Sequence, residues 1–123
     1  MLGRELNERG GIMSGLKLYV ARNNMWDGNI KFYQYDKEQR LLITGIPFDM
    51  ANQIIVEISN RKNSYSAMIE PVIAEDGLEF IVPDVYLDVC VPLNVFICKS
   101  DEDRNHLYTI ADFRIPVIER KSF

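Results

Sequence analysis

The sequence predicts an all-β domain, an antiparallel β-sandwich of seven or eight short strands, and three observations lead to this prediction. Short segments rich in β-branched and aromatic residues recur along the chain, and several of them alternate apolar with polar side chains. Gly, Pro, Asn and Asp separate these segments at short, fairly regular spacing, as turns require. No segment combines a capping box with the long apolar periodicity of an amphipathic helix.

Four strands are expected in the first half of the chain, at residues 16–21, 30–35, 41–44 and 53–59. The clearest half-buried strand is the last of these, because Ile54, Val56 and Ile58 alternate with a partly polar set. Residues 22–29 supply the Asn, Asp and Gly that are typical of a turn.

The second half predicts strands at residues 65–73, 78–82, 89–98 and 107–118, with a connection at 83–88 that has room for a helical turn and a charged tip at 99–105. Pro92 predicts an edge or bulged position near the start of its strand, because proline donates no backbone hydrogen bond. In the closing strand, Phe113, Ile115 and Val117 should share one face, with Arg114 and Pro116 on the other.

Length and composition indicate one globular domain. The chain has 123 residues, of which 47% are hydrophobic and 26% charged, enough for one core and too few for two. We assign residues 16–120 to this domain and 121–123 to a tail. Residues 1–15 contain four glycines and little periodicity, which predicts a flexible N-terminal arm.

The distribution of charged and apolar residues argues against two classes of partner, nucleic acids and membranes. The net charge is −4, from 14 basic and 18 acidic side chains, and the basic residues are scattered, so nucleic-acid binding is disfavoured. No apolar run approaches the roughly 20 residues that span a bilayer, and the first residues lack the apolar core of a signal peptide. We therefore expect no membrane partner and a protein kept in a cytoplasm or in an assembly built there.

The two cysteines are expected to be structural. Cys90 and Cys98 are eight positions apart in one expected strand, which places them on the same face and roughly 26 Å apart, too far for a disulfide. Their predicted role is that of buried thiols that pack as small hydrophobic groups, with redox or metal chemistry as the less favoured alternative.

Catalytic, metal and cofactor sites find little support. His106 is the single histidine and should be an exposed turn residue, so no nucleophile has an evident histidine base. The string at 101–105 with Asp112 in the twelfth position is similar to a calcium loop, but His106 occupies the sixth position, where glycine is needed. Asp84 and Asp88 form a pair of carboxylates without an identifiable pocket. We expect no enzyme, no cofactor and no bound metal.

The candidate interface combines aromatic residues, among them Trp26 and the nearby Tyr33 and Tyr35, with two basic residues of the expected polar turn at 60–64. Tyrosine, tryptophan and arginine concentrate binding energy at protein interfaces, whereas core packing is the competing role for the aromatic ones. The candidate interface residues are Trp26, Tyr33, Tyr35, Arg61, Lys62 and Tyr65.

The second half of the chain also carries a family likeness, in the segments Ile69-Glu70-Pro71-Val72-Ile73, Leu78-Glu79-Phe80-Ile81-Val82-Pro83, Val91-Pro92-Leu93-Asn94-Val95-Phe96-Ile97 and Ile110-Ala111-Asp112-Phe113-Arg114-Ile115-Pro116-Val117. These segments resemble the N-terminal domain of phage baseplate upper proteins, tail-tip components of phages that infect Gram-positive bacteria. In that family a strand ends in Ile/Val-Pro, and a short connection, a long apolar strand, a charged hairpin and a closing strand follow. The likeness covers about residues 28–120.

The resemblance implies an immunoglobulin-like β-sandwich that docks to the phage tail. It would be a non-enzymatic virion module, assembled in the host cytoplasm, whose partners are other tail proteins and copies of itself. The family usually continues into a helical and fibre-forming region, whereas this sequence ends at Phe123, so the resemblance leaves host attachment open. The alternative is a small acidic accessory protein that binds and inhibits a host protein.

Overall fold

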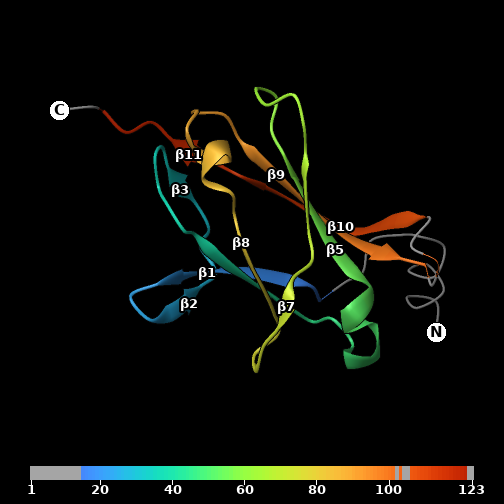
Figure 1. The fold of residues 1–123 in the computed structure, drawn as a ribbon. Coiled ribbons are helices and arrows are strands. Elements are labelled where there is room, and N and C mark those ends of the chain that lie inside the picture. The colour runs from blue at the N-terminus through green and yellow to red at the C-terminus, as the bar shows by residue number, and fades with distance from the viewer. Residues whose placement is uncertain (1–14, 102, 104–105, 122–123) are drawn as a thin grey trace.

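Two β-sheets make up most of the computed structural model, which describes residues 15–101, 103 and 106–121 (Figure 1). The larger sheet contains, in spatial order, β2 (Met25–Asp27), β1 (Lys17–Arg22), β4 (Arg40–Thr44), β8 (Leu78–Ile81) and β7 (Val72–Ile73). The second sheet contains β10 (Leu107–Ile115), β9 (Leu93–Ser100), β5 (Ile54–Ser59) and β6 (Ala67–Ile69). All neighbours within these two sheets are antiparallel. The prediction of an all-β, antiparallel architecture is confirmed.

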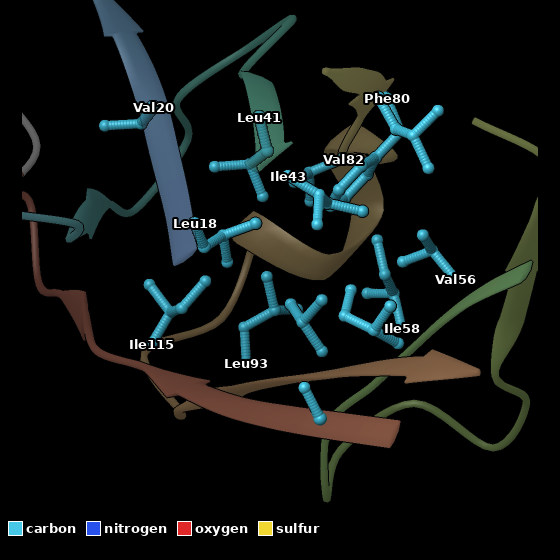
Figure 2. Packing of buried hydrophobic residues seen from close by; sticks show 14 of the residues in the cluster. Leu18, Val20, Leu41, Ile43, Val56, Ile58, Phe80, Val82, Leu93 and Ile115 are labelled. Atoms are coloured by element: carbon cyan, nitrogen blue, oxygen red, sulfur yellow. The ribbon is translucent and has the colours of Figure 1, made fainter. Parts of the chain in front are cut away.

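The hydrophobic core lies between the two sheets, because one cluster of buried side chains draws on both (Figure 2). Leu18 and Ile43 contribute to it from the five-stranded sheet, and Leu93 contributes from the four-stranded sheet. The predicted buried face of β5 is confirmed, since Ile54, Val56 and Ile58 are all buried in this core. Burying one face of each sheet in a shared core removes apolar surface from water and so stabilises the pairing.

The strand count was underestimated: the described residues contain eleven strands. The expected strand at 65–73 divides into β6 and β7 at Pro71, and that at 107–118 divides into β10 and β11 (Val117–Ile118) at Pro116. Proline has no N–H to donate to a sheet, so each proline interrupts its ladder. After Pro71 the chain passes from the edge of one sheet to the edge of the other.

The region 22–29 was assigned wholly to a turn, but it contains β2. Asn23 and Asn24 have φ values of 51° and 64°, and their flanking residues Arg22 and Met25 are register partners. Two consecutive residues with positive φ make a tight hairpin turn whose twist matches the flanking strands. The turn is therefore two residues long, and the chain pairs again directly after it.

Two further segments differ from expectation. The expected strand at 30–35 is reduced to β3 (Phe32–Tyr33), which pairs with β11 in parallel and not antiparallel orientation. Such a pair is possible because β3 and β11 lie far apart in sequence, so the connection between them is long. The expected strand at 89–98 begins only at Leu93, after Pro92, and runs to Ser100.

Two short 3-10 helices complete the described fold. The helical turn allowed for at 83–88 is present as η2 (Asp84–Leu87), whereas η1 (Phe48–Gln53) was not predicted. None of the helices in the described ranges is long and apolar enough to cross a membrane. The predicted flexible arm at 1–15 lies, apart from Gly15, outside the described residues, as does the tail beyond Lys121.

Candidate interaction site

Two loops that are far apart in sequence meet at η2. The backbone N–H of Tyr35, in the loop between β3 and β4, donates to the Leu87 carbonyl oxygen at 2.8 Å. The Tyr86 hydroxyl donates to the Tyr65 carbonyl oxygen, in the loop between β5 and β6, at 2.6 Å. We call residues 33–39, 60–66 and 84–90 the η2 end of the domain. β11 lies beside it, because the Gln34 backbone N–H donates to the Ile118 carbonyl oxygen at 2.7 Å.

The 60–66 loop is held by Asn60, a buried polar residue. Its Oδ1 accepts hydrogen bonds from the backbone N–H groups of Lys62 and Asn63, at 3.0 and 2.7 Å, and its Nδ2 donates to the Tyr86 carbonyl oxygen at 3.4 Å. One amide side chain therefore closes the turn and ties it to η2. The neighbouring Arg61 and Lys62 side chains are exposed on this fixed backbone.

The 33–39 loop is held mainly by Asp36. One carboxylate oxygen accepts from the Tyr33 backbone N–H at 2.9 Å, and the other accepts from the Arg120 guanidinium at 2.6 Å. Tyr35 and Glu38 have φ values of 71° and 52°, in a left-handed region that residues other than glycine seldom occupy. Such a backbone costs energy and persists only where its surroundings hold it. Here the Tyr35 and Glu38 backbone N–H groups are hydrogen-bonded to residues of η2.

Gln34 connects the same loop to the segment after η2. Its Nε2 donates to the Asp88 carbonyl oxygen at 3.0 Å, while its Oε1 accepts from the Cys90 thiol at 3.0 Å. The Asp84 carboxylate accepts from the Glu38 backbone N–H at 2.9 Å. Asp84, one of the two carboxylates paired in the sequence, therefore helps to position a loop.

The η2 end brings together five of the six candidate interface residues. Tyr33, Tyr35 and Tyr65 are 36%, 49% and 84% exposed, and Arg61 and Lys62 are exposed beside Tyr65 in the chain. Their role in binding stays a prediction, but their location at one end of the domain is now defined.

Two apolar residues at or beside the η2 end were missed from the sequence. Val85, in η2, is 51% exposed, and Ile118, in the strand that pairs with β3, is 38% exposed. Each belongs to a short element flanked by proline, where alternation is too brief to show which side chains face solvent. They add apolar surface near the tyrosines.

Trp26 lies elsewhere, half-buried on β2 of the five-stranded sheet. The Arg40 guanidinium lies over its ring, 5.5 Å from the centroid, and Arg40 Nε is 3.7 Å from Glu79 Oε1. Ala21, a small residue, is the register partner of Trp26 on β1, the strand between β2 and β4. Trp26 is thus neither in the core nor at the η2 end.

The residues weighed for catalysis and metal binding do not gather into a site within the described ranges. His106 is exposed as expected, and its Nδ1 is 2.9 Å from Asp101 Oδ2. The described residues contain no group of three or more His, Cys, Asp or Glu side chains able to hold a metal ion. Residues 102, 104 and 105 of the calcium-like string lie outside the described part of the chain.

The cysteine prediction holds for one residue and fails for the other. Cys98 is buried on β9, whereas Cys90 is exposed at the η2 end, and both are free thiols. They do not share a strand face, because the strand starts at Leu93, after Cys90. Burial raises the pKa of the Cys98 thiol above its ordinary value; the Thr109 side chain opposes this shift and the Glu57 carboxylate adds to it.

We expect the native protein to react with an aromatic disulfide reagent in two phases at about pH 8, one thiol per phase. Cys90 reacts first because it is exposed. Cys98 reacts slowly because it is buried and its raised pKa leaves less thiolate at any given pH. Absorbance of the released thiolate measures both phases, and Cys90→Ser should remove only the fast one. Equal rates for the two thiols would contradict this assignment.

A separate shallow cavity of about 260 Å³ lies between η1 and the turn that joins β7 to β8. Its lining includes the apolar side chains of Ile46, Phe48 and Ile73 and the turn carboxylates of Glu75 and Asp76. None of its lining residues belongs to the η2 end. The cavity is thus separate from the candidate site.

Comparisons with protein-family models, with curated proteins and with solved structures found no significant match.

Proposed function

We propose that this chain is a non-enzymatic phage virion module, an immunoglobulin-like β-sandwich that docks in the tail baseplate or to a fibre through protein–protein contacts at its η2 end. The observation that carries the proposal is the exposure of Tyr33, Tyr35, Tyr65 and Arg61 on loops whose backbone is hydrogen-bonded to η2. Its partners would be other tail proteins and copies of itself. Its location would be the virion tail, assembled in the host cytoplasm.

The composition and the rigidity of the η2 end both favour binding. Tyrosine and arginine supply large contact area and hydrogen-bonding groups, and they dominate the binding energy of many interfaces. Association is weakened by the entropy lost when loops become ordered, and loops already fixed by hydrogen bonds lose less. The bonds made by Asn60 and Asp36 provide this order before any partner arrives.

The phage assignment is supported by the order of elements in the second half of the chain. β8 leads into Val82 and Pro83, η2 forms the short connection, and β9 is the long apolar strand. β10, the last of these strands in the chain, contains Ala111 to Phe113. This is the order of elements on which the resemblance to phage baseplate upper proteins rests. The two facing sheets are compatible with an immunoglobulin-like sandwich, which remains part of the proposal.

The test of the virion role is the composition of purified particles. Mass spectrometry of phage particles from an infected culture should find the chain at a fixed ratio to the tail proteins. The alternative role, inhibition of a host protein, is suggested by the net charge of −4, which would suit a basic target. In that case the chain would be present in the infected lysate, bound to a host protein, and absent from particles.

We expect the double variant Arg61→Ala, Tyr65→Ala to weaken binding to the tail partner at least about tenfold. Folding should be unaffected, because both side chains are exposed and Tyr65 is held through its backbone carbonyl. Surface plasmon resonance on the immobilised tail partner measures the loss. Tyr108→Ala is the matched control, since Tyr108 is 50% exposed on β10, outside the η2 end. Equal affinity of the double variant and the control would place the contact elsewhere.

A further inference from the structure

The longest edge strand in the described fold is β10. It has nine residues, whereas the other edge strands of the two large sheets, β2, β6 and β7, have three, three and two. Among the described residues β10 pairs with β9 alone, so its other side presents backbone N–H and C=O groups. A long exposed strand edge is a template on which a further strand can pair.

The two faces of β10 differ in chemistry. Ala111 and Ile115 are buried and Phe113 packs partly buried against the same core. Asp112 and Arg114 alternate with them and are exposed on the outer face. They lie opposite Phe96 and Asn94 of β9 in the register of the sheet. The strand therefore carries one acidic and one basic side chain, two positions apart, on its solvent face.

A second copy of the chain can pair with this edge through a two-fold axis perpendicular to the sheet. In such an antiparallel pair, residues equally far from the axis lie opposite each other on the same face. If the axis passes through Phe113, Asp112 of each copy lies opposite Arg114 of the other. The two Phe113 rings then lie opposite each other on the core side, where aromatic pairs are favourable.

The charges also disfavour the neighbouring registers. An axis through residue 112 would place Asp112 opposite its own copy, and an axis through residue 114 would do the same for Arg114. Like charges directly opposite each other destabilise a strand pair, whereas opposite charges stabilise it. The sequence of β10 is therefore self-complementary in the register centred on Phe113.

We propose that the chain forms a two-fold symmetric dimer by antiparallel pairing of β10 with β10 of a second copy, centred on Phe113. The inference deepens the proposed function and rests on it, because it assigns a surface to the contact between copies. The four-stranded sheets of the two copies would join into one continuous sheet of eight strands. The contact is closed, since each copy uses its single β10 edge.

Two features of the chain limit the length of β10 that can pair with a second copy. The register between β9 and β10 shifts between Thr109 and Ala111, which indicates a bulge on one side. Pro116 follows β10 on the other side and has no N–H to donate. The ladder between copies would therefore run over residues 111–115.

Sedimentation equilibrium over roughly micromolar to millimolar concentrations tests the proposal on the full chain. The expected mass is twice the 14.3 kDa of one chain at the upper end of this range. Arg114→Asp and Asp112→Arg should each raise the dimer dissociation constant about tenfold or more, because each puts like charges opposite each other twice. The combined swap Asp112→Arg, Arg114→Asp should restore dimerisation.

The matched control is Lys17→Glu, the reversal of one exposed charge on β1, which lies between β2 and β4 and is no edge strand. It should leave the dissociation constant unchanged. Circular dichroism should show the same strand content for every variant, since Asp112 and Arg114 are exposed.

A monomeric wild type over the whole range would overturn the dimer, and so would a dimer that tolerates both single reversals or is not restored by the swap. These outcomes are distinct from failure of the proposed function. A monomeric chain that is nevertheless found in phage particles would leave the virion role standing and remove only the β10 contact. A dimeric chain absent from particles would remove the virion role and leave the β10 contact standing.

Discussion

Replacing Leu41 with alanine should lower the free energy of unfolding by about 2–5 kcal/mol, a large share of the stability of a domain of this size. Leu41 lies on β4, between β1 and β8, and none of its surface is exposed (Figure 2). Its register partners Val20 and Phe80 belong to the same core. Because strands on both sides hold β4 in place, the cavity left by the missing atoms should close only partly.

Thermal and urea unfolding followed by circular dichroism would measure the effect, as a fall in melting temperature on the order of 10–20 °C. The matched control is Leu107→Ala, because Leu107 is 42% exposed, is the first residue of β10 and lies outside residues 111–115. We expect the control to change stability by no more than about 0.5 kcal/mol. Similar losses for the two variants would show that the buried Leu41 side chain contributes no more to the free energy of unfolding than an exposed leucine.

Strands with one buried face were predictable from the sequence, because solvent and core impose alternate residues. The pattern at Ile54, Val56 and Ile58 identified β5 and its buried face, and that at Phe113 and Ile115 did so for the end of the chain. Segments buried on both faces are less informative. In β4, Leu41, Leu42 and Ile43 are all buried, so alternation says nothing there about which face lies toward the core.

The errors in the predicted fold arose at turns and prolines. The Asn23-Asn24 pair was placed in an eight-residue turn, although two residues with positive φ complete the turn by themselves. The parallel pairing of β3 with β11 was not predictable, since it joins residues near 32 to residues near 117 and depends on the path of the whole chain. Local patterns carry no information about pairing at that distance.

Five of the six candidate interface residues lie at the η2 end, but their arrangement there was not predictable from the sequence. The loops of Tyr35 and Tyr65 both lie against η2 because each backbone is hydrogen-bonded to it, through Leu87 and Tyr86, and these bonds join distant segments. Trp26 was grouped with Tyr33 and Tyr35 through nearness in sequence, and it lies on a sheet face instead. Proximity along the chain was therefore a poor guide to which aromatic residues share one end of the domain.

The two proposed contact surfaces use different residues. The paired segment of β10 covers 111–115, and the η2 end consists of 33–39, 60–66 and 84–90. A dimer formed through β10 would thus carry two η2 ends, and both could engage partners in one assembly. Two linked contacts bind more tightly than either alone when the geometry allows both. Repeated docking sites in a symmetric tail structure would suit such a dimer.

Replacing Gly77 with alanine should destabilise the domain by about 2–4 kcal/mol through backbone strain. Gly77 lies in the turn between β7 and β8 with a φ of 154°, which side-chain-bearing residues rarely adopt. A Cβ atom there would overlap the carbonyl oxygen of Ile43, a buried residue of β4, and would lie 3.3 Å from Leu42 Cδ1. The turn cannot easily move away, because Ala74 N–H donates to the Gly77 carbonyl oxygen at 2.7 Å.

Gly28→Ala is the matched control for this strain. A Cβ atom at Gly28 would make ordinary contact with the Tyr19 ring, at 3.4 Å, so its effect should stay within about 1 kcal/mol and can be stabilising. Urea unfolding would compare the two variants, provided that the free energy of unfolding falls with urea concentration at the same slope in both. If both unfolded at the same urea concentration, the strain at Gly77 would be too small to matter. A lower midpoint for Gly77→Ala alone would show that the β7–β8 turn needs glycine because of its backbone angle and its contact with β4.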